Sequence, residues 1–185
     1  MIYLIVIFGI LLVTVLVVIS IYNKLVGFKN RMREAWSGID VYLKKRHDLI
    51  PSIVEVVKGY AAHEKQTFED VTRFRSQAMQ AKEQTSQIES EIGLEKSIGR
   101  LMFVAENYPD LKANLNFLEL QKKLSEIEDE LALSRRYYNG TVRENNIYTE
   151  RFPSNIIANM FRFEKGKFFE INNNEKIVPH VSIQN

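Results

Sequence analysis

The chain has 185 residues, with 25 Lys and Arg against 23 Asp and Glu, a formal net charge of +2 and no cysteine. The lack of cysteine excludes disulfides, thiolate-bound metals, a cysteine nucleophile and lipoprotein acylation. Three histidines offer few ligands for a histidine-rich metal site, and we predict neither a metal nor a cofactor. The small net charge and the lack of a reading motif argue against nucleic acid as a partner.

The first 22 residues form an uncharged apolar segment. Nineteen of them are apolar, and the exceptions are Gly9, Thr14 and Ser20. A helix of about 20 such residues crosses the hydrocarbon core of a bilayer. The alternative is a cleavable signal peptide, but the segment has no basic start and no small-residue cleavage site. We therefore predict a retained transmembrane helix, with the lipid bilayer as a partner.

Basic residues directly after this segment predict its orientation. Lys24, Lys29, Arg31 and Arg33 follow it, opposed nearby by Glu34. Lys and Arg close to a span resist translocation. We predict a single-pass protein with its N-terminus outside and the rest of the chain in the cytoplasm.

Beyond this segment, apolar residues recur at alternating steps of three and four, a pattern typical of packed helices. The first series is Trp36, Ile39, Leu43, His47, Ile50, Val54, Val57, Ala61, Glu64, Phe68, Val71, Arg75 and Ala78. Pro51 predicts a kink or a first helical turn, because proline lacks an N–H. The stretch from Gly59 to His63 predicts a chain reversal.

A second series follows a predicted break at Asn107-Tyr108-Pro109-Asp110 and lies in a helix expected over about 110–152. It reads Leu120, Leu124, Ile127, Leu131, Ser134, Tyr138, Thr141, Asn145, Tyr148 and Phe152, and Pro153 ends it. A shorter amphipathic stretch between the two series reads Ile88, Ile92, Glu95 or Lys96, Gly99 and Phe103. No segment alternates like a strand. We predict an all-α fold in which an N-terminal transmembrane helix precedes an up-and-down four-helix bundle of long antiparallel helices.

The chain after Pro153 is rich in Phe and Ile. We expect these residues to dock against the open end of the bundle; the alternative is that they lie on the bilayer surface, aided by Arg162, Lys165 and Lys167. Residues 172–185 are predicted to be a loosely held tail. The predicted parts are therefore an anchor at 1–22, a bundle at 23–163 and a tail at 164–185.

Known catalytic motifs are missing from the sequence. There is no Gly-rich phosphate loop, G-x-S-x-G, S-x-x-K or H-E-x-x-H. A di-metal carboxylate bundle needs Glu three positions before each histidine, but Lys44 and Tyr60 precede His47 and His63. We predict that the protein is not an enzyme and has no catalytic residues.

Two charge clusters have simpler interpretations. The acidic run Glu126, Glu128, Asp129 and Glu130 is typical of a solvated helix face. The basic run Lys44-Lys45-Arg46 is a candidate contact for an acidic partner or lipid headgroups. On a straight helix, however, it would lie about 30 Å beyond the membrane, outside a Debye length of about 10 Å.

Polar residues interrupt both apolar series. Buried polar groups need hydrogen-bond partners, so we expect a network between facing helices. Setting helix register is its favoured role, and a ligand site, a switch or a peptide groove is the alternative. Arg135 and Arg136 are predicted to reach Asp40 or Asp48. The candidate structural or interaction network is Asp40, His47, Asp48, Glu64, Arg135, Arg136 and Asn145.

Several longer motifs occur in order along the chain. They are Tyr22-Asn23-Lys24-Leu25-Val26, Ala35-Trp36-Ser37-Gly38-Ile39-Asp40-Val41, Leu43-Lys44-Lys45-Arg46-His47-Asp48-Leu49-Ile50-Pro51, Val57-Lys58-Gly59-Tyr60-Ala61, His63-Glu64, Ala105-Glu106-Asn107-Tyr108-Pro109-Asp110-Leu111-Lys112-Ala113-Asn114, Arg135-Arg136-Tyr137-Tyr138-Asn139, Phe152-Pro153-Ser154 and Phe168-Phe169-Glu170. Together they resemble the LemA family of bacterial membrane-anchored proteins over roughly residues 22 to 170.

The resemblance implies a span followed by a helical bundle at the bacterial inner membrane, and no established enzymatic activity. It also suggests partners, namely an HtpX-type membrane protease or TPM-domain proteins. Our leading hypothesis is a non-enzymatic membrane-anchored scaffold that forms homo-oligomers or binds partner proteins. The alternative is an adaptor or sensor subunit of a membrane protease or envelope-stress system.

Overall fold

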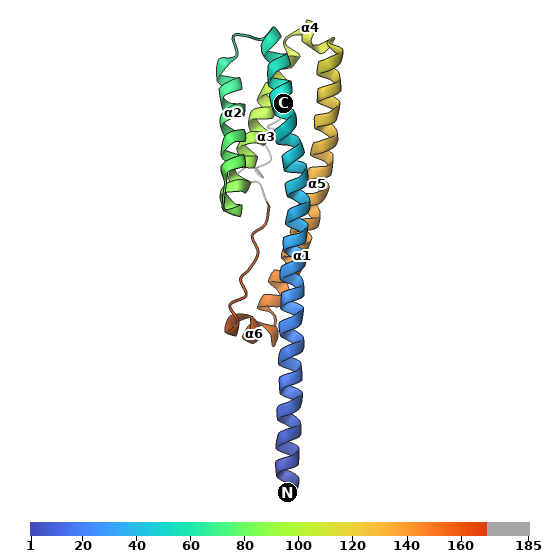
Figure 1. Ribbon diagram of the computed structural model, residues 1–185, viewed down its shortest axis with the longest axis vertical. Coiled ribbons are helices and arrows are strands. Elements are labelled where there is room, and N and C mark those ends of the chain that lie inside the picture. Colours follow the sequence, from blue (N-terminus) through green and yellow to red (C-terminus); the bar gives the residue numbers. More distant parts are fainter. Residues whose placement is uncertain (170–185) are drawn as a thin grey trace, which may run out of the picture. The chain divides into compact units, whose positions relative to one another are not determined.

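The computed structural model describes residues 1–169, in which the regular elements are helices (Figure 1). They are α1 (Ile2–Tyr60), α2 (Lys65–Gln80), α3 (Gln84–Glu106), α4 (Pro109–Lys112), α5 (Leu115–Glu150) and α6 (Ser154–Met160). Helices hold 86% of the described residues and none of these residues forms a strand, which confirms the all-α prediction. The predicted tail at 172–185 lies outside the described residues.

Two predicted breaks between helices are confirmed. α1 ends at Tyr60 and α2 begins at Lys65, so the chain reverses over the Gly59 to His63 region. α3 ends at Glu106, and Pro109 is the first residue of α4. Proline suits this position because the first N–H groups of a helix have no partner within it.

The single helix predicted over about 110–152 is wrong, because the chain breaks again at Asn114. There the short α4 has ended and α5 begins at Leu115. The Asn114 side-chain Oδ1 accepts a hydrogen bond from the Phe117 N–H at 3.0 Å, which caps the new helix. α5 ends at Glu150, shortly before Pro153.

The chain forms two compact units. Unit 1 comprises residues 1–46 and 125–168. Unit 2 comprises residues 47–124 and, among the described residues, Phe169. α1 and α5 each contribute residues to both units, and the predicted domain boundaries stay predictions.

Unit 2 contains a four-helix core. Its segments of α1, α2, α3 and α5 alternate in direction (Figure 1), consistent with the predicted up-and-down bundle. The buried core consists of Ile50, Ile53, Val57, Ala61, Phe68, Val71, Leu94, Ile98, Leu101, Ala105, Leu111, Phe117 and Leu124. Each buried Leu or Ile stabilises the fold by about 1.5–3 kcal/mol. This core includes five residues of the first predicted series, namely Ile50, Val57, Ala61, Phe68 and Val71.

The face of α3 that is buried differs from the predicted one. Gly99 is exposed and Phe103 is 68% exposed, whereas the buried residues of α3 are Ile88, Glu91, Leu94, Ser97, Ile98, Leu101 and Ala105. The predicted face was wrong because the series of buried residues on α3 includes Glu91, and a charged residue type was not expected at a core position.

Unit 1 contains only two long helical segments, from α1 and α5, together with α6. The second predicted series is buried at Leu131, Tyr138, Thr141, Asn145 and Tyr148. Its last member, Phe152, is 75% exposed because α5 has already ended. Two helices enclose little apolar volume, so aromatic contacts such as Trp36 to Tyr138, with ring centroids 5.2 Å apart, contribute much of the packing.

Candidate functional site

His47 lies at the meeting point of three helices in unit 2. Its Nε2 is 2.8 Å from Oε1 of Glu91 on α3, and the two side chains are 8% and 0% exposed. Groups buried this deeply require a polar partner, because water does not reach them. His47 thus has a polar neighbour, as predicted, but this neighbour is Glu91, a residue that the predicted network did not include.

The backbone of His47 makes a second contact, which follows from Pro51. Within α1 the carbonyl of residue 47 would normally accept the N–H of residue 51, but proline has none. Instead the Arg75 Nε–H of α2 donates to the His47 carbonyl oxygen at 2.7 Å. Arg75 therefore replaces a hydrogen bond that Pro51 removes, and α1 continues through Pro51 to Tyr60.

Together these contacts tie α1 to both α2 and α3 at one residue. The half-buried Arg75 donates a hydrogen bond to the His47 backbone, and the carboxylate of the buried Glu91 lies beside the His47 imidazole. Setting helix register stays the predicted role of this arrangement.

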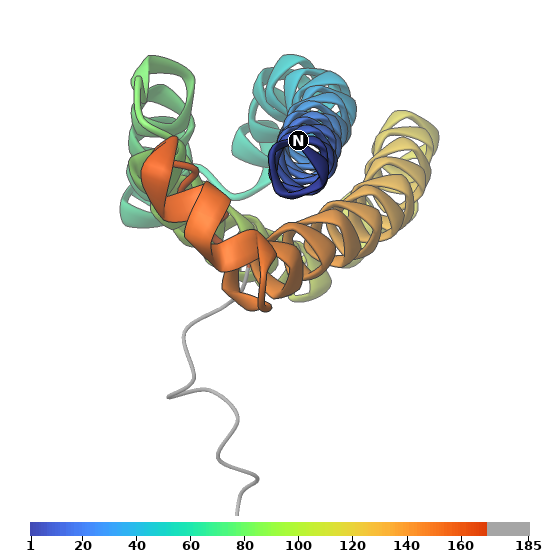
Figure 2. The same ribbon diagram turned by 90° about the horizontal axis from the view of Figure 1, so that it is seen from below.

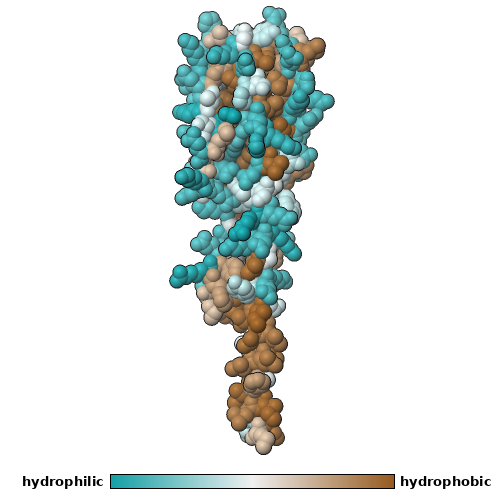
Figure 3. Space-filling view, viewed as in Figure 1, coloured by the Kyte–Doolittle hydropathy of each residue, from teal (hydrophilic) through white to brown (hydrophobic). Residues whose placement is uncertain are grey.

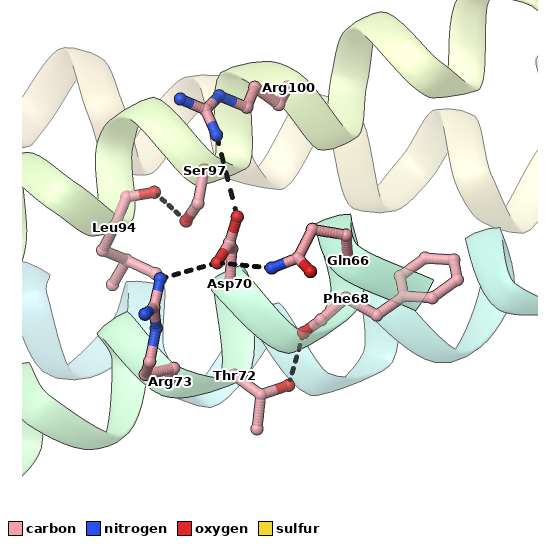
Figure 4. Close-up of polar contacts among 8 residues, drawn as sticks. All are labelled: Gln66, Phe68, Asp70, Thr72, Arg73, Leu94, Ser97 and Arg100. Carbon is pink, nitrogen blue, oxygen red and sulfur yellow. Dashed lines mark hydrogen bonds and ion pairs between the residues drawn. The ribbon is translucent and has the colours of Figure 1, made fainter. Parts of the chain in front are cut away.

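A more exposed polar cluster lies on α2 and α3 (Figure 4). Asp70 accepts hydrogen bonds from Gln66 Nε2 at 3.2 Å and Arg73 Nη2 at 2.6 Å, both on its own helix. Arg100 of α3 lies 3.7 Å away and has a 70% exposed side chain. Such an exposed ion pair contributes about 0–1 kcal/mol, so the buried His47 contacts dominate the polar coupling of these helices.

Unit 1 has its own ion pair, in which the arginine is buried and the glutamate is partly exposed. Arg46, 0% exposed, donates from Nη1 to Glu128 Oε1 at 2.9 Å and to Oε2 at 3.3 Å. Nearby on the same two helices, a hydrogen bond to the Glu130 carboxylate, and then its charge, raise the pKa of Tyr42. Glu128 of the acidic run on α5 therefore faces α1, whereas Glu126, Asp129 and Glu130 are exposed, as predicted for a solvated helix face.

The asparagines of α5 hold the segment that follows α6. Asn146 donates from Nδ2 to the Gly166 carbonyl at 3.0 Å and accepts the Gly166 N–H at 2.8 Å. Asn145, a predicted network residue, is buried and donates to the Glu164 carbonyl at 3.4 Å. The Tyr138 hydroxyl donates to the Lys167 carbonyl at 2.7 Å. The backbone groups of this segment are therefore hydrogen-bonded to side chains of α5, whereas an extended segment usually bonds to the backbone of a neighbouring strand.

The other predicted network residues are not placed in one cluster. In unit 1, Asp40 and Arg136 are exposed and Arg135 is half-buried; in unit 2, Asp48 is exposed and Glu64 half-buried. The pairing of Arg135 or Arg136 with Asp40 or Asp48 stays a prediction. Within residues 1–169, no group of three or more His, Asp or Glu side chains lies close enough to hold a metal ion.

The N-terminal part of α1 presents an apolar surface. Its mean hydropathy reaches 3.3 over 18 residues, none of which is buried. Figure 3 shows this surface as a continuous hydrophobic region at the N-terminal end. An open depression lined by Ile7, Ile10, Leu11, Thr14 and Val15 lies on it, and it contains no titratable side chain. The segment has the length and composition of a membrane span.

Comparison with protein families agrees with this architecture. The model of the LemA family matches residues 35–183. The chain belongs to the LemA family. The match begins after the apolar segment and includes the helices that carry the pairs of Arg46 with Glu128 and of His47 with Glu91.

Individual relatives of this LemA-family chain come from two groups of proteins. It is 28% identical to Protein LemA of Metamycoplasma hominis, over 84% of this chain and 71% of the relative. It is 23% identical to Magnetosome protein MamQ 2 of Paramagnetospirillum magneticum and 20% identical to Magnetosome protein MamQ of Magnetospirillum gryphiswaldense. Both MamQ alignments cover 80% of this chain and 64% of the relative, so the chain spans less than two thirds of those proteins.

Two important residues of the LemA-family chain, Glu91 and Arg46, were missed or misjudged from sequence. Glu91 lies three residues after Ile88 and three before Leu94, a helical spacing that a charged residue type concealed. Arg46 lies three residues after Leu43 and four before Ile50, so its spacing also pointed inward. In both cases the spacing was the available signal, and the partner carboxylate or imidazole could not be foreseen.

Proposed function

We propose that this chain is a non-enzymatic, membrane-anchored helical scaffold of the bacterial inner membrane that self-associates or binds partner proteins. The observation that carries the proposal is the continuity of α1 from Ile2 to Tyr60. One uninterrupted helix supplies both the exposed apolar segment and core residues of the folded domain. A partner bound to that domain would be held at the membrane.

A scaffold explains the polar residues better than a catalytic site does. General acids, bases and nucleophiles must reach a substrate. The buried groups at hand, His47, Glu91 and Arg46, instead contact other parts of the fold. Their chemistry supports a rigid helical body.

The anchor is tested by fractionating membranes that carry the full chain or a variant lacking residues 2–22. The full chain should stay with the membrane in alkaline carbonate, and the shortened chain should be released. Release of the full chain would contradict the anchor, whatever its partners are.

Orientation is tested with a single cysteine, because the chain has none of its own. Glu89→Cys places a thiol at an exposed position of α3. An impermeant maleimide should label it only after the cells are opened. Labelling in intact cells would place the domain outside and contradict the basic-residue argument.

The scaffold role is tested by crosslinking in native membranes followed by affinity purification and mass spectrometry. Crosslinks between copies of the chain would support a homo-oligomer. Stoichiometric recovery of a membrane protease or a TPM-domain protein would instead favour an adaptor subunit. Recovery of neither would contradict the scaffold role.

A further inference from the structure

The helix α6 packs beside the end of the apolar segment within unit 1. Ile157 and Ala158 of α6 are buried with Leu25 and Tyr148, and Val18 and Ile21 pack against this cluster. Figures 1 and 2 show α6 next to the N-terminal half of α1. At 1.5 Å per residue, Val18 lies about 6 Å inside the end of the segment at Tyr22. The position of α6 along α1 therefore coincides with the last turn of the proposed span.

Aromatic rings hold α6 at this level. Tyr22 makes edge contacts with Phe161 and Phe163, with ring centroids 4.8 and 5.6 Å apart. Tyr is a residue type that collects at the headgroup level of membrane proteins. A bilayer that surrounds residues 1–22 would thus place its headgroups beside Phe161.

The outer face of α6 remains apolar and exposed. On α6, Ile156 and Met160 are 55% and 67% exposed, and Phe152 just before the helix and Phe161 just after it are 75% and 49% exposed. These four residues form an exposed apolar stripe, whereas Ile157 and Ala158 of the same helix are buried. The stripe is continuous with the apolar surface of the span through the contacts of Tyr22. The expected docking of the Phe-rich segment therefore accounts for one face of α6 and leaves the other uncovered.

Cationic side chains lie near the buried cluster of α6 and Tyr148. Lys24 Nζ and the Arg151 guanidinium lie 5.3 and 5.4 Å from the centre of the Tyr148 ring, and Lys165 pairs with Glu150. Exposed apolar residues beside Lys and Arg are the composition of an interfacial helix on anionic lipid.

Arg162 adds an exposed cation directly after α6. It has φ of 55° just after α6, where Gly is usual because a side chain strains this conformation. The Phe163 N–H bonds to the Ala158 carbonyl at 2.9 Å and the Arg162 N–H to the Asn159 carbonyl at 3.3 Å, which completes the helix-ending motif.

We propose that the stripe of Phe152, Ile156, Met160 and Phe161 inserts into the headgroup region of the bilayer as a second membrane contact. The occupant of this face is lipid, because the face continues the surface of the span at the level where the span leaves the hydrocarbon core. This inference rests on the proposed anchor. A second contact off the axis of α1 would limit rotation and tilt of unit 1 at the membrane.

The test uses the full chain in phosphatidylcholine and phosphatidylglycerol vesicles, with an environment-sensitive dye on a single cysteine. Met160→Cys probes the stripe, and Ile156→Cys serves if the first variant misfolds. Phe103→Cys is the matched control, since this Phe on α3 is also apolar and 68% exposed. Val13→Cys probes the span itself. Lipids with a doxyl quencher near the headgroup or near the bilayer centre report the depth of each dye.

The dye at residue 160 should emit at shorter wavelength than the control and be quenched most by the shallow lipid, as for a helix about 5–10 Å deep in the interface. The dye at residue 13 should be quenched most by the deep lipid. Quenching at 13 but not at 160 would overturn the interfacial contact and leave the anchor intact. No quenching at 13 would overturn both. A dye at 160 that is shielded from aqueous iodide yet not quenched by lipid would identify a protein as the occupant, which also contradicts the proposal.

Discussion

Two neighbouring residues of α1, Arg46 in unit 1 and His47 in unit 2, each face a glutamate of another helix. Glu128, the partner of Arg46, has a side chain that is 32% exposed. Glu91, the partner of His47, is 0% exposed. Three helices meet at the pair in unit 2, whereas unit 1 has two long helices and leaves its glutamate within reach of water.

The difference shows that the free energy contributed by an ion pair depends on whether water can reach its members. Where water can replace a lost partner, removal of that partner costs little; where it cannot, the remaining group stays unsatisfied. We therefore expect the polar contacts of unit 2 to be decisive for stability and those of unit 1 to be more tolerant of substitution.

The largest expected effect compares Glu91→Ala with Glu128→Ala. Glu91→Ala should lower the free energy of unfolding by about 3 kcal/mol, because it leaves the His47 imidazole buried without this partner. Glu128→Ala should cost about 1 kcal/mol, since water can approach Arg46 from the side that the carboxylate vacates. Urea unfolding of the full chain in detergent measures both. Equal costs would contradict the role of water access.

A double variant sharpens this result. His47→Leu combined with Glu91→Leu removes both polar groups and should cost much less than Glu91→Ala, because no buried group is left unsatisfied. A cost equal to the sum of the single changes would show that the two side chains are not coupled.

The next effect concerns the close packing of α2 on α3. A Cβ added to Gly93 would lie 2.5 Å from two ring atoms of Phe74, whereas one added to Gly99 meets nothing within 4 Å. Gly93→Ala should destabilise the protein by about 2 kcal/mol through overpacking. Gly99→Ala on the same helix should stabilise it by about 0.5–1 kcal/mol. Thermal unfolding checks both signs, and stabilisation by Gly93→Ala would show that the ring moves freely.

A smaller effect tests the replacement of the hydrogen bond that Pro51 removes. Arg75→Met should cost about 1.5 kcal/mol, because the His47 carbonyl loses its donor. In a Pro51→Ala background the cost should shrink, since residue 51 then supplies an N–H to the same oxygen. The measurement is a double-mutant cycle from unfolding curves. An unchanged cost for Arg75→Met in the Pro51→Ala background would mean that Arg75 acts through another contact.

The smallest expected effect is at the exposed Glu119 and Lys123 of α5. The hydrogen bond from Lys123 Nζ at 2.6 Å, and then its charge, lower the pKa of Glu119. The contribution of this pair is therefore present above the ordinary pKa of the carboxyl and is lost as the pH falls through its lowered value. Lys123→Ala should raise the pKa of Glu119 in a carboxyl NMR titration and leave the stability at neutral pH nearly unchanged. A large loss of stability would contradict the low value assigned to exposed pairs.

The all-α class, the apolar segment and much of the core were predictable from the order of residues alone. Residues such as Leu43, Val57 and Leu131 repeat at helical spacing, and this period depends only on the geometry of one helix. The reversal after Tyr60 and the break before Pro109 were also predictable, because Gly and Pro act through their own backbone. His47 was recognised as a polar residue within an apolar series, because its position in the series follows from helical spacing alone.

The pairing of polar residues, in contrast, could be seen only in the folded chain. Glu91 and Glu128 have the same side chain, and their local sequences do not reveal that one is fully buried and the other reaches water. The donor for the His47 carbonyl, Arg75, comes from 28 residues away. Burial and pairing depend on the distance between helices. This distance is a property of the folded chain, and the spacing of residues along one helix does not reveal it.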